Sequence, residues 1–98
     1  MILVRDIFRL KFGKAKDALS VWNKSKKTLQ NVNHYPERVL TDFTGSYYTL
    51  VIESTYNNLS EFEESLRNAF KTKEYQEWYK KFIPLAEGGY REIFKIIE

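Results

Sequence analysis

The sequence predicts an α+β fold in a single domain spanning residues 1–98, and three observations carry this prediction. A chain of 98 residues is too short for two separate hydrophobic cores. Its hydrophobic fraction of 43% and aromatic fraction of 16% are large enough to fill one core. Segments with strand-like composition alternate with segments whose apolar residues recur every three or four positions, as in an amphipathic helix.

The first two elements are predicted to be a strand and a helix. Residues Ile2–Phe12 are rich in β-branched and aromatic side chains and precede Gly13, which is typical of a strand that ends in a turn. Residues Lys14–Leu29 carry a stripe that is apolar except at Lys26, whose aliphatic stem can lie along the edge. This stripe predicts a helix with one face on a core.

A β-hairpin is predicted next. Residues 31–36 have loop chemistry, with two asparagines, a histidine and a proline. The two runs that follow, Glu37–Phe43 and Tyr47–Tyr56, have strand composition and flank the short connection Thr44–Ser46. A connection of this length favours antiparallel pairing of the two strands.

Helix and strand signals continue in the second half. Ser60 and Glu63 have the spacing of a capping box, which predicts the start of the second helix. We expect a break near residues 71–73 and a further helical piece that a proline ends. Gly88–Gly89 indicates a turn or bulge, and Tyr90–Ile97 is predicted to be the last strand.

The resulting order predicts the ferredoxin-like β-α-β-β-α-β fold, a four-stranded antiparallel sheet with two helices on one face. The other face also carries apolar residues, because Leu3, Ile7 and Val51 alternate with residues that point to the helices. A second copy of the sheet is the simplest cover, which predicts a homodimer. The alternative is that these are isolated surface residues, which are common.

Three stretches of the sequence carry a resemblance to a known family. They are Val4–Lys14 (VRDIFRLKFGK), Glu74–Trp78 (EYQEW) followed by Pro84, and Glu87–Phe94 (EGGYREIF), of which the last is the most specific. With them the chain resembles the dimeric α/β-barrel superfamily and, within it, the NIPSNAP-like branch. The resemblance covers nearly the whole chain.

The resemblance implies a homodimer whose two sheets pack face to face into a barrel-like core. It leaves the activity open, because the superfamily includes small monooxygenases, haem-degrading enzymes and isomerases. Many NIPSNAP-like members have no established activity. In the haem enzymes the ligating histidine is normally placed elsewhere, so no haem role is transferred to this chain.

His34 and Tyr47 are the candidate catalytic residues. His34 is the only histidine and lies in the loop before the second strand, where it can act as a general base. The alternative is a histidine that is exposed or bonded within its loop. Tyr47 and its neighbour Tyr48 can supply hydroxyl groups.

Aromatic residues on the helices are the candidate ligand-binding residues, because apolar pockets with a few polar tips hold small aromatic ligands. Core packing is the alternative and the more usual role of such a stripe. The full candidate set is Trp22, Tyr48, Tyr75, Trp78, Tyr79 and Phe82.

Asp6 interrupts an apolar strand face. If it is buried, its pKa can rise enough for acid–base chemistry; otherwise it pairs with Arg38 or Arg91. One histidine and no cysteine fall short of a metal site unless two copies share one across a dimer interface, so we expect neither metal nor cofactor. The third strand lacks the aromatic signature of RNA-recognition domains, and a net charge of +3 is mild, so we expect no nucleic acid partner.

Two functions therefore stay open. One is a homodimer that binds a small ligand or a partner without strong catalytic machinery. The other is a cofactor-independent monooxygenase or isomerase acting on a small aromatic or quinone-like substrate. The lack of cysteine, of a leader sequence and of an apolar run long enough for a bilayer predicts a cytoplasmic protein with no membrane partner.

Overall fold

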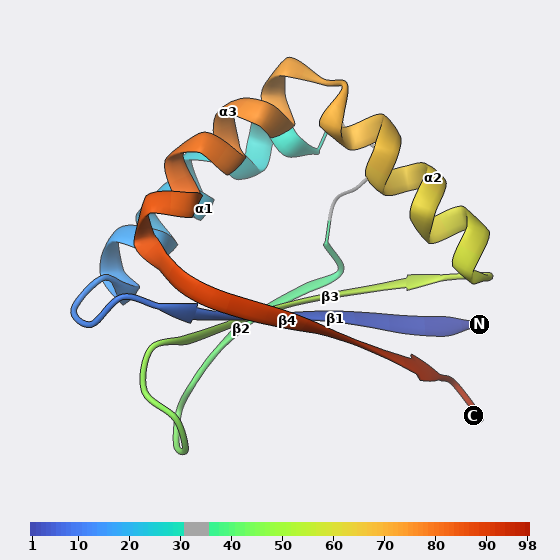
Figure 1. Cartoon of the computed structure of the whole chain (residues 1–98), viewed down its shortest axis with the longest axis horizontal. Helices are drawn as coiled ribbons and strands as arrows, with labels where there is room; N and C mark the ends of the chain where they lie inside the picture. The colour runs from blue at the N-terminus through green and yellow to red at the C-terminus, as the bar shows by residue number, and fades with distance from the viewer. Residues whose placement is uncertain (31–35) are drawn as a thin grey trace.

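The computed structural model describes residues 1–30 and 36–98 (Figure 1). Four strands form one antiparallel sheet in the order β2-β3-β1-β4, and the helices lie on one side of it. This arrangement confirms the predicted ferredoxin-like fold. The elements are β1 (Ile2–Leu10), α1 (Ala15–Leu29), β2 (Arg38–Thr41), β3 (Thr49–Tyr56), α2 (Leu59–Phe70), α3 (Lys73–Phe82), the short 3₁₀ helix η1 (Ile83–Leu85) and β4 (Ala86–Lys95).

The predicted capping box at Ser60 is wrong by two residues. Asn58 caps α2, since its side-chain oxygen accepts a hydrogen bond from the Glu61 amide at 2.9 Å. The Glu61 carboxylate in turn accepts one from the Asn57 amide at 2.9 Å. The reciprocal chemistry expected of a capping box is therefore present, with asparagine in place of serine. The predicted break is confirmed, because Thr72 caps a separate helix, α3.

The hairpin strands are shorter than predicted, because β2 ends at Thr41 and β3 begins at Thr49. Asp42 closes the connection by accepting a hydrogen bond from the Thr49 amide at 3.0 Å. Tyr48 has a φ of +59°, which is uncommon outside glycine and ends the strand geometry there. The Tyr47–Tyr48 pair therefore lies in the β2–β3 connection, in spite of its high strand propensity.

Strand β4 begins four residues earlier than predicted, at Ala86 instead of Tyr90. Its pairing with β1 shifts register between Arg9 and Leu10, so the expected bulge lies beside the two glycines. A Cβ atom at Gly89 would lie 2.8 Å from the carbonyl oxygen of Ile7. Glycine is required there because the two strands approach so closely.

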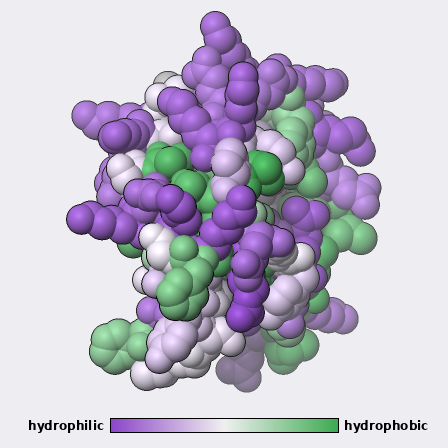
Figure 2. Space-filling view, turned by 60° about the vertical axis from the view of Figure 1, so that its left-hand side comes forward, coloured by the Kyte–Doolittle hydropathy of each residue, from purple (hydrophilic) through white to green (hydrophobic). Residues whose placement is uncertain are grey.

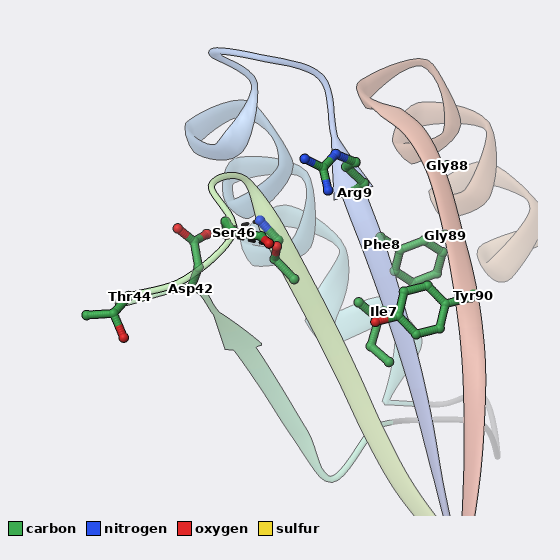
Figure 3. A pocket seen from close by; sticks show the side chains of 10 residues that line it. Ile7, Phe8, Arg9, Asp42, Thr44, Ser46, Gly88, Gly89 and Tyr90 are labelled. Atoms are coloured by element: carbon green, nitrogen blue, oxygen red, sulfur yellow. Dashed lines mark hydrogen bonds between the residues drawn. The ribbon is translucent and has the colours of Figure 1, made fainter.

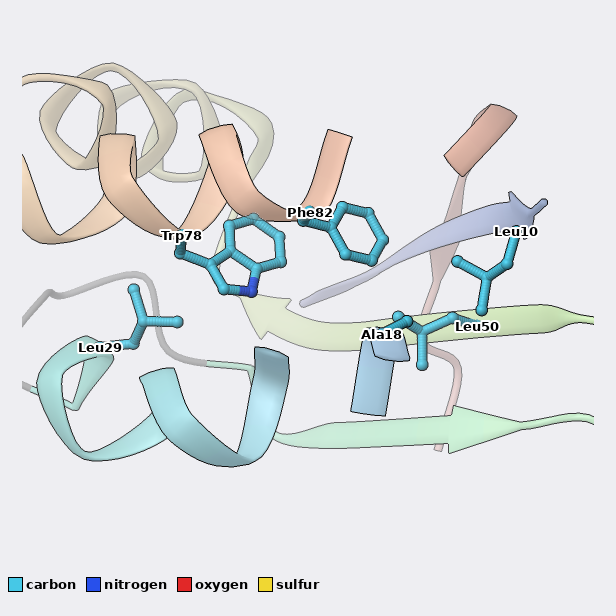
Figure 4. Close-up of a cluster of buried hydrophobic side chains, with 6 residues drawn as sticks. All are labelled: Leu10, Ala18, Leu29, Leu50, Trp78 and Phe82. Atoms are coloured by element: carbon cyan, nitrogen blue, oxygen red, sulfur yellow. The ribbon is translucent and has the colours of Figure 1, made fainter. Parts of the chain in front are cut away.

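The main core lies between the sheet and helices α1 and α3 (Figure 4). The ring of Phe82 stacks on Trp78 at a centroid distance of 5.1 Å and meets the edge of Phe8 at 4.9 Å. These aromatic contacts join α3 to β1. The buried members of the cluster are Leu10, Ala18, Leu29, Leu50, Trp78 and Phe82.

The face of the sheet that the helices leave uncovered, called the open face below, carries apolar side chains as predicted. Residues directly opposite in an antiparallel pair share a face, which places Leu3, Ile7, Val51, Tyr90 and Phe94 together on the open face. Figure 2 shows mostly hydrophilic side chains at the top of the view, with hydrophobic ones in the middle of the view and toward its lower end.

Truncation of Phe82 should destabilise the fold more than any surface change. The side chain is 1% exposed, so we expect Phe82→Ala to lower the free energy of unfolding by about 3–5 kcal/mol. Urea unfolding followed by circular dichroism measures this loss. The matched control is Phe43→Ala, where the ring is 100% exposed and no loss above about 0.5 kcal/mol is expected.

Candidate functional site

A small cavity lies between the helices and the sheet. Its volume is about 50 Å³, and both aromatic and polar side chains form its walls. Residues from both the sheet and the helices contribute, namely Val4, Asp6, Phe8, Trp22, Leu29, Pro36, Ile52, Ser54, Tyr56, Phe62, Tyr75 and Trp78. The cavity therefore has the composition of a ligand pocket, although its volume holds only a few atoms.

Asp6 places a carboxylate in the cavity wall. Arg91 lies directly opposite on β4, and its Nε donates to Asp6 Oδ1 at 2.5 Å. The same guanidinium lies over the ring of Phe62, 4.9 Å from the centroid. Of the two partners that the sequence allowed for Asp6, the structure selects Arg91. Arg38 is opposite Glu53 and points to the open face.

Two tyrosines of the cavity are held in their neutral form. Burial raises the pKa of Tyr75 to about 12, and the nearby negative charge of Asp6 adds to the effect. Burial also raises the pKa of Tyr56 above its ordinary value. Both phenols are therefore protonated at physiological pH, and the Tyr56 hydroxyl is hydrogen-bonded with Ser65 and Ser54.

Trp78 adds a hydrogen-bond donor. Its side chain is 7% exposed, and its indole Nε1 has no hydrogen-bond partner within residues 1–30 and 36–98. A buried indole N–H without a partner costs free energy that a bound acceptor would recover. Trp78 lines the same cavity as Asp6 and the two phenols.

The structure brings only some of the predicted site residues together. Trp22, Tyr75 and Trp78 line the cavity, whereas Phe82 lies in the adjoining core. Tyr79 is 40% exposed on the outer side of α3.

The hydroxyl candidates of the hairpin lie elsewhere. Tyr48 packs against the ring of Phe12, with 4.9 Å between centroids, and Tyr47 is 76% exposed. Neither lines the cavity. His34 lies outside the described residues, so its catalytic role stays a prediction.

Sequence reasoning overlooked the contribution of β3 to the cavity. Ser54 and Tyr56 lie on the same face of β3 as Ile52, and all three line the cavity. The two-residue periodicity of a strand was the available signal. Phe62 of α2 also forms part of the cavity wall.

A second hollow lies on the open face, beneath the β2–β3 connection (Figure 3). It is an open cleft of about 500 Å³, lined among others by Ile7, Arg9, Asp42 and Tyr90. Arg9 is paired with Glu87 at 3.0 Å. Its width and exposure distinguish this cleft from the small cavity under the helices.

The centre of the open face holds a buried carboxylate, that of Glu53. Only 2% of the side chain is exposed, because Arg5 and Arg38 enclose it at 2.8 Å and 2.5 Å. Burial alone would raise the pKa of Glu53, but the hydrogen bonds and charges of the two arginines outweigh burial and lower it. Glu53 is therefore ionised at neutral pH.

Within the part of the chain that the structure describes, no three histidine, cysteine or acidic side chains are grouped as a metal would require. Across the same residues, no helix is long and apolar enough to cross a bilayer.

The sequence matches no model of a known protein family, and no curated protein matches it. Solved structures do match. A NIPSNAP-domain protein from Burkholderia xenovorans superposes with a TM-score of 0.88 at 14% identity, covering 98% of this chain and 94% of that one. A NIPSNAP-family protein of unknown function from Agrobacterium tumefaciens gives 0.89 at 16% identity, covering 98% and 87%. This chain has the fold of the NIPSNAP-domain proteins.

Proteins of a second group share the ferredoxin-like arrangement at lower similarity. One from Nitrosomonas europaea, provisionally assigned as an antibiotic biosynthesis monooxygenase, superposes with a TM-score of 0.73 at 12% identity over 100% of both chains. The NIPSNAP-like fold predicted from the sequence is thus confirmed. Identities this low show the fold alone and assign no chemistry to this chain.

The neutral state of Tyr75 makes stability depend on pH. Its pKa is about 12 in the folded chain against an ordinary value of 10.0, so the unfolded state loses its proton first as pH rises. We expect the free energy of unfolding to fall between about pH 10 and 12, and Tyr75→Phe to remove about 2 kcal/mol of that fall. Urea unfolding at several pH values measures the slope.

Tyr47→Phe is the control for this experiment, because it removes the hydroxyl of a side chain that is 76% exposed. This variant should keep the wild-type slope. The same slope in wild type and Tyr75→Phe would contradict the prediction.

Proposed function

We propose that this chain is a homodimeric domain that binds a small aromatic ligand in the cavity between the helices and the sheet. The observation that carries the proposal is the unpartnered indole N–H of Trp78, a residue that lines the same cavity as the carboxylate of Asp6. If the cavity residues served packing alone, pairing these polar groups or replacing them with apolar ones would increase the stability of the fold.

The ligand that fits these groups is a small, flat molecule with a hydrogen-bond acceptor such as a carbonyl oxygen. Trp22, Tyr75 and Trp78 supply aromatic surface, and the Trp78 N–H supplies the donor. The resting cavity of about 50 Å³ is smaller than one aromatic ring requires. Binding must therefore move wall side chains apart, which limits the ligand to one or two rings.

The homodimer is supported by the open face. Tyr90 is 63% exposed and Phe94 is 43% exposed, and both stand beside Ile7 or Leu3 on the central strand. An apolar surface spread over four strands is unusual on a monomer. The open face of a second copy is equally apolar and would cover this surface.

Ligand binding can be observed at the indole itself. The chain has two tryptophans, so a ¹⁵N–¹H spectrum shows two indole signals. We expect acetophenone to shift the Trp78 signal. Ethylbenzene has the same ring without an acceptor and should bind at least about tenfold more weakly. A tenfold ratio corresponds to about 1.4 kcal/mol, the contribution of one hydrogen bond.

Trp78→Phe is the test variant and Tyr47→Phe its control. The first keeps an aromatic ring but removes the donor, and should abolish the preference for acetophenone over ethylbenzene. The second changes a residue outside the cavity and should preserve it. Equal affinities of wild type for the two compounds would rule out the acceptor requirement.

The homodimer is tested by a charge placed on the open face. Val51 lies opposite Ile7 and Leu40, so Val51→Lys sets an ammonium group among apolar side chains. We expect sedimentation to give a dimer for the wild type and a monomer for this variant. Glu64→Lys, on the exposed side of α2, is the control and should stay dimeric. A monomeric wild type at about 100 µM would refute the homodimer, since a standard interface binds more tightly than this.

A cofactor-independent monooxygenase or isomerase is the second candidate function. It is favoured by the carboxylate of Asp6 and the indole N–H of Trp78, which bring a base and a donor to one cavity. Turnover of a phenolic or quinone-like substrate that Asp6→Asn abolishes, with ligand affinity retained, would establish this function. Binding without turnover across such substrates would leave the ligand-binding function alone.

A further inference from the structure

An open groove of about 460 Å³ runs along the first six residues of β4, which is an edge strand of the sheet. We call this hollow the edge groove. Residues 86–91 of β4 line it, and the rest of the lining comes from Asp6 and Phe8 on β1 and from Ile83 in η1. Two of the six β4 residues are glycines, which contribute no side chain and leave room beside the strand.

The edge groove and the cavity under the helices share a wall. Asp6 and Phe8 line both hollows. The Asp6 side chain is 21% exposed, so a carboxylate that lines the cavity also reaches solvent. Phe8 lies directly opposite Gly89, where β4 has no side chain to cover it (Figure 3). A single layer of side chains therefore separates the two hollows.

Arg91 completes the shared wall. Its Nε donates to Asp6 Oδ1 at 2.5 Å, and its guanidinium lies 4.9 Å from the centre of the Phe62 ring, which lines the cavity. The Arg91 side chain is 41% exposed. A long, exposed side chain changes rotamer rapidly and without movement of the backbone. Rotation of Arg91 therefore opens the cavity toward the edge groove and leaves Asp6 in contact with solvent.

Two other walls of the cavity are harder to move. The Trp78 ring is 7% exposed and stacks on Phe82 with 5.1 Å between centroids. Phe62 is 5% exposed, and its ring meets that of Tyr56 at 5.3 Å, so an opening there would separate α2 from the sheet. Both movements would disrupt close packing, which rotation of Arg91 leaves intact.

We propose that the edge groove is the outer half of the ligand site. The aromatic ring of the ligand occupies the cavity, and a polar chain attached to the ring passes Arg91 and lies in the edge groove. This inference rests on the proposed function and specifies the class of ligand. The ligand is an aromatic compound with an acceptor at one end, which meets the Trp78 N–H, and a neutral polar chain at the other.

The two volumes support a ligand in two parts. The cavity of about 50 Å³ limits the buried part to one or two rings, even after its walls move apart. The edge groove of about 460 Å³ has the size of an ordinary ligand pocket and is open without any rearrangement. Most of the volume that a ligand can occupy therefore lies outside the cavity.

Arg91 determines what the polar chain should carry. Among residues 1–30 and 36–98, only its Nε has a hydrogen-bond partner, so its two Nη groups can donate to a ligand. A guanidinium has no acceptor of its own. The edge groove therefore favours a chain that carries a hydrogen-bond acceptor, such as an amide carbonyl.

The charges around the edge groove favour an uncharged chain. Asp6 is paired with Arg91, and Glu87 is paired with Arg9 at 3.0 Å. Because these charges balance, a charged group on the ligand would gain little net attraction and would still lose part of its hydration. An amide keeps the hydrogen bond to Arg91 without that loss.

Two probes of equal size test the edge groove. They are 4-acetyl-N-methylbenzamide and 4-isobutylacetophenone, which share the acetyl-bearing ring and carry opposite it a polar and an apolar chain with the same number of non-hydrogen atoms. We expect the amide to bind about tenfold more tightly, a ratio that one hydrogen bond to a charged donor supplies. Non-specific apolar binding would give the opposite order. Titration of the Trp78 indole signal measures both affinities.

Arg91→Met is the main variant, because it removes the donors and keeps an unbranched side chain. It should abolish the preference for the amide over the isobutyl compound. Arg67→Met, at an exposed position in the last turn of α2, is the matched control and should retain this preference.

Ile83→Trp tests the edge groove without changing the ion pair. Ile83 is 43% exposed and lines the groove, so an indole at this position should obstruct it. The amide should lose about tenfold in affinity, the gain expected from its chain, and more than acetophenone loses. Leu59→Trp, at a position of α2 that is 50% exposed, is the matched control and should bind the amide as the wild type does.

The outcomes separate the two proposals. If acetophenone shifts the Trp78 signal but the amide binds no more tightly than the isobutyl compound, the role of the edge groove is refuted and the cavity site stands. A preference for the amide that persists in both Arg91→Met and Ile83→Trp refutes it as well. If none of the three compounds shifts the Trp78 signal, the proposed ligand site is wrong and the outer half of the site is wrong with it.

Discussion

Both candidate surfaces depend on the register of the central strand β1. Alternate residues of a strand point to opposite faces, so Asp6 enters the cavity under the helices while Arg5 and Ile7 point to the open face. A slip of one residue in the pairing would exchange the two sets. The cavity and the row of charges on the open face (Arg38, Glu53, Arg5 and Glu92) are therefore positioned together by one register.

Charge pairing across strands reinforces that register. Asp6 meets Arg91 across β1 and β4, and Glu53 meets Arg5 and Arg38 across three strands. In the correct register each of these carboxylates has an arginine directly beside it. A shifted register would leave each carboxylate partly buried without its arginine. Breaking a buried ion pair in this way costs about 3–5 kcal/mol of stability. Hydrophobic burial and electrostatics thus select the same arrangement.

The sequence was sufficient to predict the order of the elements and which strand residues share a face, since both follow from periodicity over many residues. The prediction failed at positions where several local structures have similar stability. Asn58 and Ser60 are both good helix caps, and only the path of the preceding strand decides between them. Tyr48 has high strand propensity but occupies a turn conformation. The partner of Asp6 could not be chosen, because the choice depends on strand order and register: β4, with Arg91, is next to β1, whereas β2, with Arg38, is not.

The similarity to NIPSNAP-domain structures at 14% to 18% identity shows that very different sequences adopt this fold. The pattern of apolar and polar residues along each element constrains a fold more than the identity of each residue does. The proposed ligand site and the proposed dimer surface depend instead on few side chains, Trp78 and Asp6 on the helix side of the sheet and residues such as Val51 and Tyr90 on the open face. Because the two sets lie on opposite sides of the sheet, substitutions in one set should leave the other set in place. We therefore expect that ligand binding and dimer formation can be tested separately, although one backbone register positions both sets.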